Sequence, residues 1–159
     1  MITDETFSEE VRSVSRTAFA VAYLILNHTS DSEDAVSDAI LSAYEHRRSL
    51  RTTDSFRAWF LRIVRNEAYD ILRNRKRTTP VDVFPDQPAP QCNRDTTLDL
   101  RSAIMQLPEQ QRSALLLQQE GYTLEEIATI LAIPVGTVKS RLFRAKETLR
   151  IILEDHIDA

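Results

Sequence analysis

The sequence predicts an all-α protein built from two small helical domains and a proline-rich linker. Hydrophobic residues recur at helical spacing along most of the chain, and no segment alternates with the period of two expected of strands. Four of the six prolines fall within residues 78–96. A chain of 159 residues is long enough for two small domains with modest cores. We therefore expect domains at 1–77 and 97–159, joined by a linker at 78–96.

Three amphipathic helices are expected in the N-terminal domain. An apolar stripe at helical spacing marks the first, starting at Phe7 and continuing through Ala22 to Ile25. The second covers residues 31–46, with Asp31 as its N-cap. The third opens at Asp54 or Ser55. Its aromatic residues share one helical face and are therefore expected in the core: Phe56, Trp59 and Phe60.

Prolines dominate the segment between the domains. Proline lacks an amide proton and disfavours helix in the residue before it, so we expect an extended linker at 78–96. Cys92 lies in this segment and is expected to be an exposed, unreactive thiol. As the single cysteine of the chain, it excludes an internal disulfide and any multi-cysteine metal site.

The composition argues against an enzyme. Only Gly121 and Gly136 are present, which excludes a Walker loop and a GxGxxG turn. The histidines lack metal-ligand spacing, and HExxH and GxSxG motifs are absent. We expect no metal and no cofactor. No apolar run is long enough to span a membrane, and the acidic N-terminus does not resemble a signal peptide.

The net charge of −4 conceals strong segregation along the chain. Residues 47–77 hold ten Lys and Arg against three acids, and residues 136–150 hold five against one. The flanking segments are acidic, with net charges of −7 for 1–46, −5 for 78–135 and −3 for 151–159. Two basic blocks of this kind indicate either contact with a polyanion or solvated helix faces, and charge alone does not separate the two.

A helix-turn-helix is predicted between residues 122 and 150. Thr123 and Glu126 have the spacing of a capping box, and a short turn at residues 132–134 precedes a second amphipathic helix. Small and basic residues lie opposite the apolar face of that helix, which suits DNA contact: Thr137, Lys139, Ser140, Arg141 and Arg144. The alternative is an ordinary helical hairpin with a solvated basic face.

Several short motifs extend this prediction to a family. They are Leu107-Pro108, Gln111-Arg112, Glu126-Ile127-Ala128 and the run 136–142 with Arg144-Ala145, and they resemble region 4 of sigma factors, most closely the extracytoplasmic-function (ECF) group. Residues 57–77 resemble region 2.3–2.4 of the same family, and residues 31–47 resemble region 2.2. One departure is Ala132, where many relatives carry glycine. The resemblance covers nearly the whole chain, and it implies that residues 136–144 contact the −35 promoter element.

Within the first basic block, Arg62, Asn66, Tyr69 and Arg73 follow i, i+4, i+7, i+11 and share one helical sector, with Arg65 close by. A basic face with an amide and an aromatic ring suits phosphate neutralisation and stacking on an unpaired base. Asp70 lies off this sector and is expected to pair with a neighbouring arginine. The resemblance implies that this helix reads the −10 element and that the loop at 50–55 holds a flipped base.

The helix expected at 31–46 carries an acidic face around one leucine: Asp34, Asp38, Leu41 and Glu45. Read alone, this is either a solvated surface or an acid-rimmed docking site. The resemblance implies docking on the β′ clamp helices of core RNA polymerase, with the β flap as a further contact. Relatives often have Gln-Glu where this chain has Ser37-Asp38.

The predicted function is that of a cytoplasmic alternative sigma factor. It would bind core RNA polymerase, recognise −35 and −10 elements and aid DNA opening, without insertion into a membrane. The resemblance also implies an anti-sigma partner. A second hypothesis is a stand-alone helix-turn-helix regulator with a helical sensor domain, which would require a dimerisation surface and tight DNA binding without polymerase.

Overall fold

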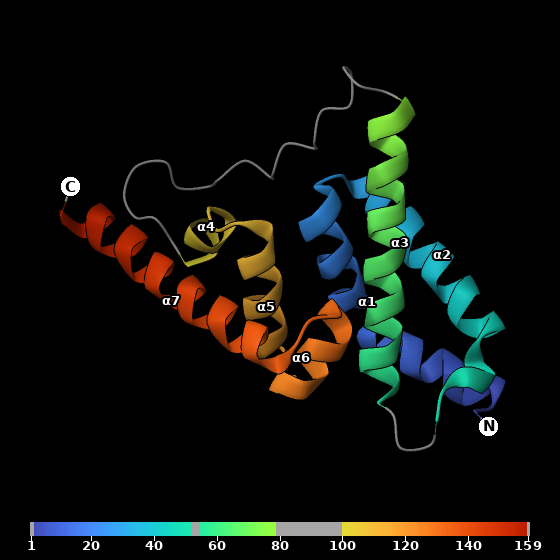
Figure 1. Cartoon of the computed structure of the whole chain (residues 1–159). Coiled ribbons are helices and arrows are strands. Elements are labelled where there is room, and N and C mark those ends of the chain that lie inside the picture. Colours follow the sequence, from blue (N-terminus) through green and yellow to red (C-terminus); the bar gives the residue numbers. More distant parts are fainter. Residues whose placement is uncertain (1, 52–54, 79–99, 159) are drawn as a thin grey trace. The chain divides into compact units, whose positions relative to one another are not determined.

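A computed structural model describes residues 2–51, 55–78 and 100–158 of the chain (Figure 1). In these ranges every regular element is a helix, which confirms the all-α fold class. The elements are α1 (Asp4–Leu26), α2 (Thr29–Glu45), the 3-10 turn η1 (Arg47–Ser49), α3 (Phe56–Thr78), α4 (Leu100–Met105), α5 (Glu109–Gln119), α6 (Leu124–Leu131) and α7 (Val135–Asp158). The chain divides into two compact units, the first containing α1 to α3 and the second α4 to α7 apart from residues 129–132.

In the first unit each of the three long helices packs on the other two. The side of α2 that meets its neighbours consists of small residues, because Ala35, Ala39 and Ala43 are fully buried. Alanine at every fourth position lets the backbones approach closely while larger side chains fill the remaining space. From α1 and α3 these include Val14, Val21, Leu26, Phe60, Leu61 and Val64.

An aromatic cluster joins the three helices near the start of α3. The Phe7 ring lies edge-on to Tyr44 at 5.4 Å and to Phe56 at 5.6 Å between centroids. Phe56 also stacks on Phe60 at 5.8 Å. Phe56 and Phe60 are buried, as predicted, whereas Trp59 is half-buried beside Phe56. Edge-to-face and stacked geometries of this kind stabilise a core beyond simple burial.

The corner between α1 and α2 corrects one prediction. Asp31 is not the N-cap of the second helix, because α2 begins at Thr29 and the Nδ1 atom of His28 accepts the Asp31 amide at 3.2 Å. The Asp31 carboxylate pairs instead with Arg75 of α3. Arg75 also donates to the Leu26 carbonyl at 3.2 Å. One arginine therefore fixes the far part of α3 to the end of α1 and the start of α2.

In the second unit α7 packs on both α5 and α4. Val138, Leu142 and Ala145 are buried at positions i, i+4 and i+7 of α7, the spacing of one helical face. Opposing apolar residues from α4, α5 and the segment between them are also buried: Ala103, Leu107, Ala114, Leu115 and Leu117. This face fixes how α7 is rotated about its axis.

The predicted capping box opens α6. Glu126 receives a hydrogen bond at its carboxylate from the Thr123 amide at 3.0 Å, and its own amide donates to the Thr123 hydroxyl at 3.1 Å. The helix ends in a Schellman motif, in which Ile133 N bonds Ala128 O at 3.0 Å. The residue that reverses the chain there is Ala132, with φ of 57°.

Three predictions lie outside the described residues: the linker beyond Thr78, the state of Cys92, and residues 52–54 of the expected base-holding loop. Ser55 is one of the two residues at which α3 was predicted to open, and its hydroxyl accepts the Ala58 amide at 3.3 Å and so caps the helix. None of the helices that the structure describes is long and apolar enough to cross a membrane.

Candidate nucleic-acid interface

The first exposed cationic surface lies on the N-terminal half of α7. The Pro134 carbonyl accepts hydrogen bonds from Thr137 and Val138 at 3.0 and 3.2 Å, so the helix begins directly after this proline. Because Val138, Leu142 and Ala145 face inward, the opposite side of the helix faces solvent. Of the five residues predicted to contact DNA, Lys139, Ser140 and Arg144 are exposed, while Thr137 and Arg141 are half-buried.

An open recess gathers three of these five residues and adds one that sequence reasoning missed. It is lined by Lys139, Ser140, Phe143 and Arg144. Phe143 is 68% exposed, whereas a phenylalanine in a folded protein is usually buried. Its spacing could have revealed it, since it follows Lys139 by four residues and Ser140 by three. The surface is thus cationic with an exposed aromatic ring within it.

Gly136 leaves the start of this surface without a side chain. It lies in the first turn of α7, is exposed, and a Cβ placed on it would meet nothing within 4 Å. Packing inside the protein therefore gives no reason for a glycine here. Glycine also weakens a helix relative to alanine. What it provides is bare backbone where another molecule can approach closely.

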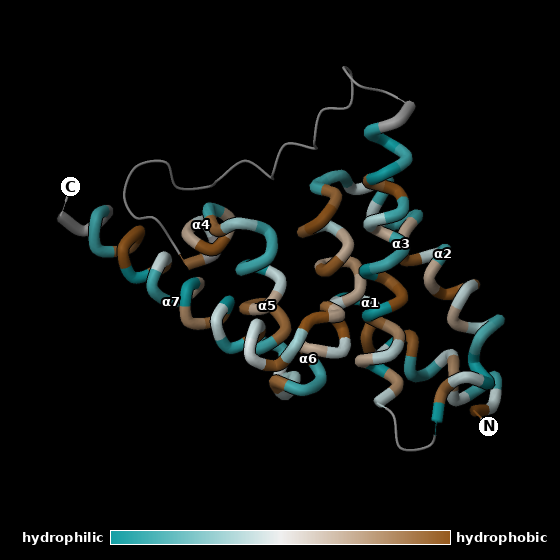
Figure 2. The backbone as a smooth tube through the Cα atoms, in the orientation of Figure 1, coloured by the Kyte–Doolittle hydropathy of each residue, from teal (hydrophilic) through white to brown (hydrophobic). Residues whose placement is uncertain are grey.

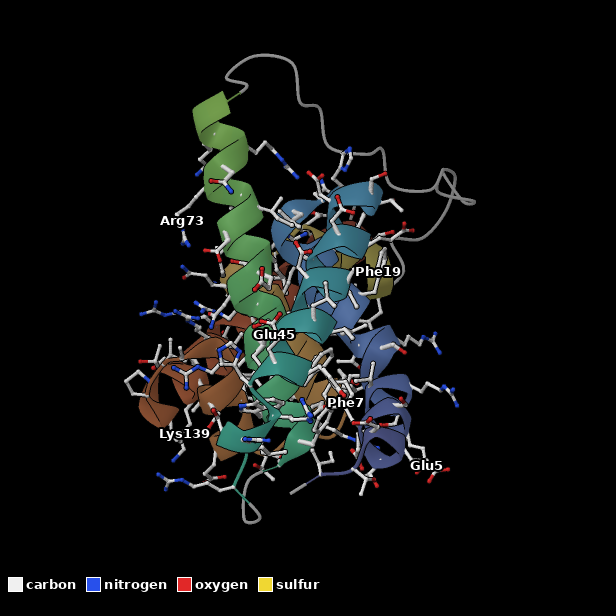
Figure 3. The ribbon with its side chains drawn as sticks, turned by 90° about the vertical axis from the view of Figure 1, so that its right-hand side faces the viewer. Glu5, Phe7, Phe19, Glu45, Arg73 and Lys139 are labelled. Atoms are coloured by element: carbon white, nitrogen blue, oxygen red, sulfur yellow. The ribbon has the colours of Figure 1, made fainter. Side chains whose placement is uncertain are left out.

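The second cationic surface lies on α3, and most of its predicted residues come together there. Arg65, Asn66, Tyr69 and Arg73 line an open recess, while Arg62 is exposed outside it. The Arg65 guanidinium lies over the Tyr69 ring at 4.7 Å and donates to the Asn66 side-chain oxygen at 3.3 Å. Figure 3 shows Arg73 on the side of α3 that faces away from α2.

Asp70 was only partly anticipated. As predicted, its carboxylate pairs with a neighbouring arginine, Arg73. It does not lie apart from the cationic sector, however, because it lines the same recess as Arg73 and Tyr69. Residues three apart are neighbours on the surface of a helix, so Asp70 lies next to Arg73. Its angular position on a helical wheel did not reveal this closeness.

The two ends of α3 differ in character. Phe60, Leu61, Val64 and Ala68 bury its first part in the helical bundle. Beyond them Figure 2 shows a predominantly hydrophilic stretch, which corresponds to residues 73–77. The cationic recess therefore lies where the firmly packed part of α3 passes into a basic segment in which Arg73 and Lys76 are exposed and Arg75 is half-buried.

Comparison with known proteins places both surfaces in one family. Residues 11–78 match the family model of sigma-70 region 2, and residues 97–149 match that of sigma-70, region 4. The ECF RNA polymerase sigma factor SigM of Mycobacterium tuberculosis is 35% identical over 94% of this chain and 76% of its own length. The RNA polymerase sigma-H factor of Pseudomonas aeruginosa is 30% identical over 92% of this chain and 91% of its own. This chain belongs to the ECF sigma factors.

Solved structures agree with this sigma factor in fold. The sigma factor RpoE from Bartonella quintana, determined in complex with the anti-sigma factor NepR, superposes with a TM-score of 0.76 at 30% identity, covering 93% of this chain and 96% of that one. The α7 recess lies within the region 4 match and the α3 recess within the region 2 match. The alternative of a stand-alone regulator is not supported, because residues 11–78 match region 2 where that hypothesis requires a sensor domain.

The acidic face of this sigma factor lies on α2. Asp34, Asp38, Leu41 and Glu45 are all exposed, and Leu41 is 64% accessible. The face continues onto α3 through Glu67. Partial burial, and secondarily the nearby Asp38 carboxylate, raise the pKa of Glu67 above its ordinary value. This surface is therefore acidic, with one exposed leucine among its carboxylates.

The histidines of this sigma factor that can be described serve helix ends. His28 caps α2 through Nδ1, and the Nδ1 atom of His46 lies 2.8 Å from the Ser42 carbonyl at the end of the same helix. In residues 2–51, 55–78 and 100–158 no three His, Cys, Asp or Glu side chains come together as a metal site would require.

Proposed function

We propose that this sigma factor binds core RNA polymerase through the exposed face of α2 and directs it to promoters through α7 and α3. The observation that carries the proposal is the presence of two exposed cationic recesses in two units of one chain, each inside the matching sigma region. Two such surfaces suit two separate promoter elements. The domains are proposed to be 1–77 and 97–159, with the linker 78–96 passing over the polymerase between them.

The α7 recess suits the −35 element. In a helix-turn-helix the first turns of the second helix enter the major groove, where the bare backbone at Gly136 permits close approach. Lys139 suits a phosphate, and Arg144 suits the O6 and N7 atoms of a guanine. Phe143 offers an apolar surface to a thymine methyl group. Thr137, Ser140 and Arg141 complete the proposed contact set.

The α3 recess suits the −10 element in its opened form. Arginines that neutralise the backbone, together with an aromatic ring, are typical of surfaces that hold unpaired strands. Arg62, Arg65, Asn66, Tyr69 and Arg73 are the proposed contacts. The loop at 50–55, part of which lies outside the described residues, is proposed to hold a flipped base. By stabilising the separated strand, α3 would favour DNA opening.

The partners follow from the same surfaces. Asp34, Asp38, Leu41 and Glu45 are proposed to dock on the β′ clamp helices, and the second domain on the β flap. Because the similar RpoE is known in complex with NepR, we also propose an anti-sigma partner for this chain. The protein would act in the cytoplasm, where the polymerase is, and would make or break no covalent bond itself.

Transcription in vitro tests this function. Core polymerase is combined with a genomic template library, with and without the chain. We expect promoter-specific transcripts only when the chain is present, with a shared upstream and downstream element among their promoters. If the chain adds no specific transcript, the proposed function is wrong.

A further inference from the structure

Two large side chains of the α7 recess have no partner inside the protein that accounts for them. Phe143 is 68% exposed and lines the recess with Lys139, Ser140 and Arg144. In the part of the chain that the structure describes, no other aromatic ring contacts Phe143 and no acid pairs with Arg144. An apolar ring left in water adds little to stability, so both groups are available to a ligand.

Between them, the hydroxyl of Ser140 is already used as a donor. Its Oγ atom donates to the Gly136 carbonyl at 3.1 Å, and the residue is exposed. A hydroxyl has one proton and two acceptor lone pairs, so Ser140 offers an acceptor to the recess. The recess therefore presents an apolar ring, an acceptor and the paired donors of a guanidinium.

These three groups have a definite order across α7. At about 100° per residue, Phe143 lies about 60° to one side of Ser140 and Arg144 about 40° to the other. A recognition helix lies in the major groove, and the edges of the base pairs cross that groove from one strand to the other. Along such an edge the helix offers first the apolar ring, then the acceptor, then the donors.

One base pair has the complementary order in the major groove. A guanine paired with 5-methylcytosine shows the C5 methyl group, then the N4 amino donor, then the O6 and N7 acceptors of guanine. Unmethylated cytosine lacks the methyl group. In an adenine–thymine pair the methyl group is followed by the O4 acceptor of thymine, and the adenine N6 donor stands where an arginine needs the guanine O6 acceptor.

We propose that the α7 recess binds a guanine–cytosine pair whose cytosine is methylated at C5. Phe143 packs on the methyl group, Ser140 accepts from the N4 amino group and Arg144 donates to the guanine. The inference rests on the proposed function, because it assigns one base pair of the −35 element. The methyl group of thymine occupies the same ring position, so Ser140 and Arg144 decide between the two pyrimidines. Cytosine methylation thus strengthens promoter recognition by this sigma factor.

The test measures binding of holoenzyme to synthetic promoter duplexes. The starting promoter is one found by the transcription experiment, and each position of its −35 element carries in turn a G·C, G·5-methylcytosine, A·T or A·U pair in both orientations. At one position the methylated pair is expected to bind about fourfold tighter than G·C, the gain from burying one methyl group. It should also bind tighter than A·T there, because thymine O4 would face the acceptor of Ser140.

Two variants assign the gain to its side chains. Phe143→Ala should make the methylated and unmethylated pairs equal at that position. Ser140→Ala should keep the methyl gain but narrow the difference between the methylated pair and A·T. Ile151→Ala is the matched control, since it removes a 51% exposed apolar side chain of α7 outside both recesses, and it should leave every preference unchanged.

Any of three results would overturn the inference. They are the absence of a position that gains from cytosine methylation, a gain that persists in Phe143→Ala, and a difference from A·T that Ser140→Ala leaves unchanged. A gain of A·T over A·U without a gain from cytosine methylation is a case of the first and means that Phe143 reads thymine instead. A wild-type holoenzyme that gives no promoter-specific transcript contradicts the proposed function, and that result is reached before any methylated duplex is compared.

Discussion

At the scale of single residues, three helix ends depend on a left-handed backbone. Asn27 ends α1 with φ of 49°, Gly121 follows α5 with φ of 94°, and Ala132 follows α6 with φ of 57°. Glycine and asparagine adopt this conformation readily, whereas the Cβ of alanine meets the following carbonyl oxygen. Gly121 and Ala132 close the same Schellman hydrogen-bond pattern, so they form a natural comparison.

Replacing Ala132 with glycine is expected to stabilise the turn between α6 and α7 by about 0.5–1 kcal/mol, because the strain at that turn is relieved. Amide hydrogen exchange in α5 and α7 measures the change. Gly121→Ala should have the opposite sign, since its added Cβ meets nothing within 4 Å and only the backbone conformation is affected. Equal signs for the two variants would contradict this account.

Replacing Gly136 with alanine should have opposite effects on the stability of α7 and on DNA binding. Gly136→Ala adds a methyl group that meets no protein atom within 4 Å, and it should stabilise α7 by about 0.5–1 kcal/mol through the better helix propensity of alanine. We expect the same change to weaken binding of a promoter duplex several-fold, because the backbone can no longer approach the groove as closely. Thermal unfolding and fluorescence anisotropy with duplex DNA measure the two effects. A variant that is more stable and binds equally well would show that close approach is not needed.

At the scale of helices, α7 offers two exposed arginines in different settings. Arg144 lines the cationic recess, whereas Arg150 is held by Glu147 at 3.0 Å and Glu154 at 3.2 Å. Arg144→Ala should cost about 1–3 kcal/mol in recognition of the −35 element if the side chain reads a guanine. Arg150→Ala should leave promoter affinity unchanged. Similar losses for both variants would mean that only net charge matters.

The acidic face of α2 makes a further prediction. Asp38→Arg should strongly reduce affinity for core polymerase, because it places a cation where a basic partner is expected. The substitution should not unfold the protein, since removing the Asp38 carboxylate relieves its repulsion of Glu67. Glu9→Arg, the same charge change at an exposed position of α1, is the control. Size-exclusion chromatography with core polymerase measures binding, and thermal unfolding measures stability. If Asp38→Arg binds the polymerase with wild-type affinity, this face is an ordinary solvated surface and not a docking site.

Helices α1, α2, α3, α6 and α7 could be predicted from the sequence because apolar periodicity reports burial directly, whereas α4 and α5 were not predicted as separate helices. Phe56, Val138 and Leu142 lie in the core, as their spacing indicates. The capping box predicted for Thr123 and Glu126 is present. The beginning of α2 could not be predicted, because a histidine ring competes with Asp31 for the capping position.

The surfaces were harder to predict than the core. Phe143 was overlooked because an exposed phenylalanine contradicts the usual rule of burial. Asp70 was predicted to lie off the cationic sector, yet it lines the same recess, because a helical wheel gives the direction of the Cα–Cβ bond but not the reach of the side chain.

At the scale of the whole molecule, the net charge of −4 hides the charge that DNA would meet. The logarithm of the DNA-binding constant should fall linearly with the logarithm of salt concentration, by about 0.9 for each phosphate neutralised. Lys139→Gln should make this slope shallower by about one, if Lys139 contacts a phosphate. Titrations of duplex DNA at several salt concentrations measure both slopes. An unchanged slope for the variant would exclude Lys139 from the phosphate contacts.

The contacts of Arg75 connect the two helices of the first unit that are proposed to bind DNA and polymerase. Arg75 follows Arg73 by two residues and holds both the Leu26 carbonyl and the Asp31 carboxylate, so the basic end of α3 is tied to the corner from which α2 starts. A DNA strand bound at Arg73 would therefore be connected through Arg75 to α2, the helix proposed to dock on the polymerase. Docking of α2 would in turn restrain the position of α3. Binding of the DNA strand on α3 and docking of the polymerase on α2 would then both act on one packed three-helix unit.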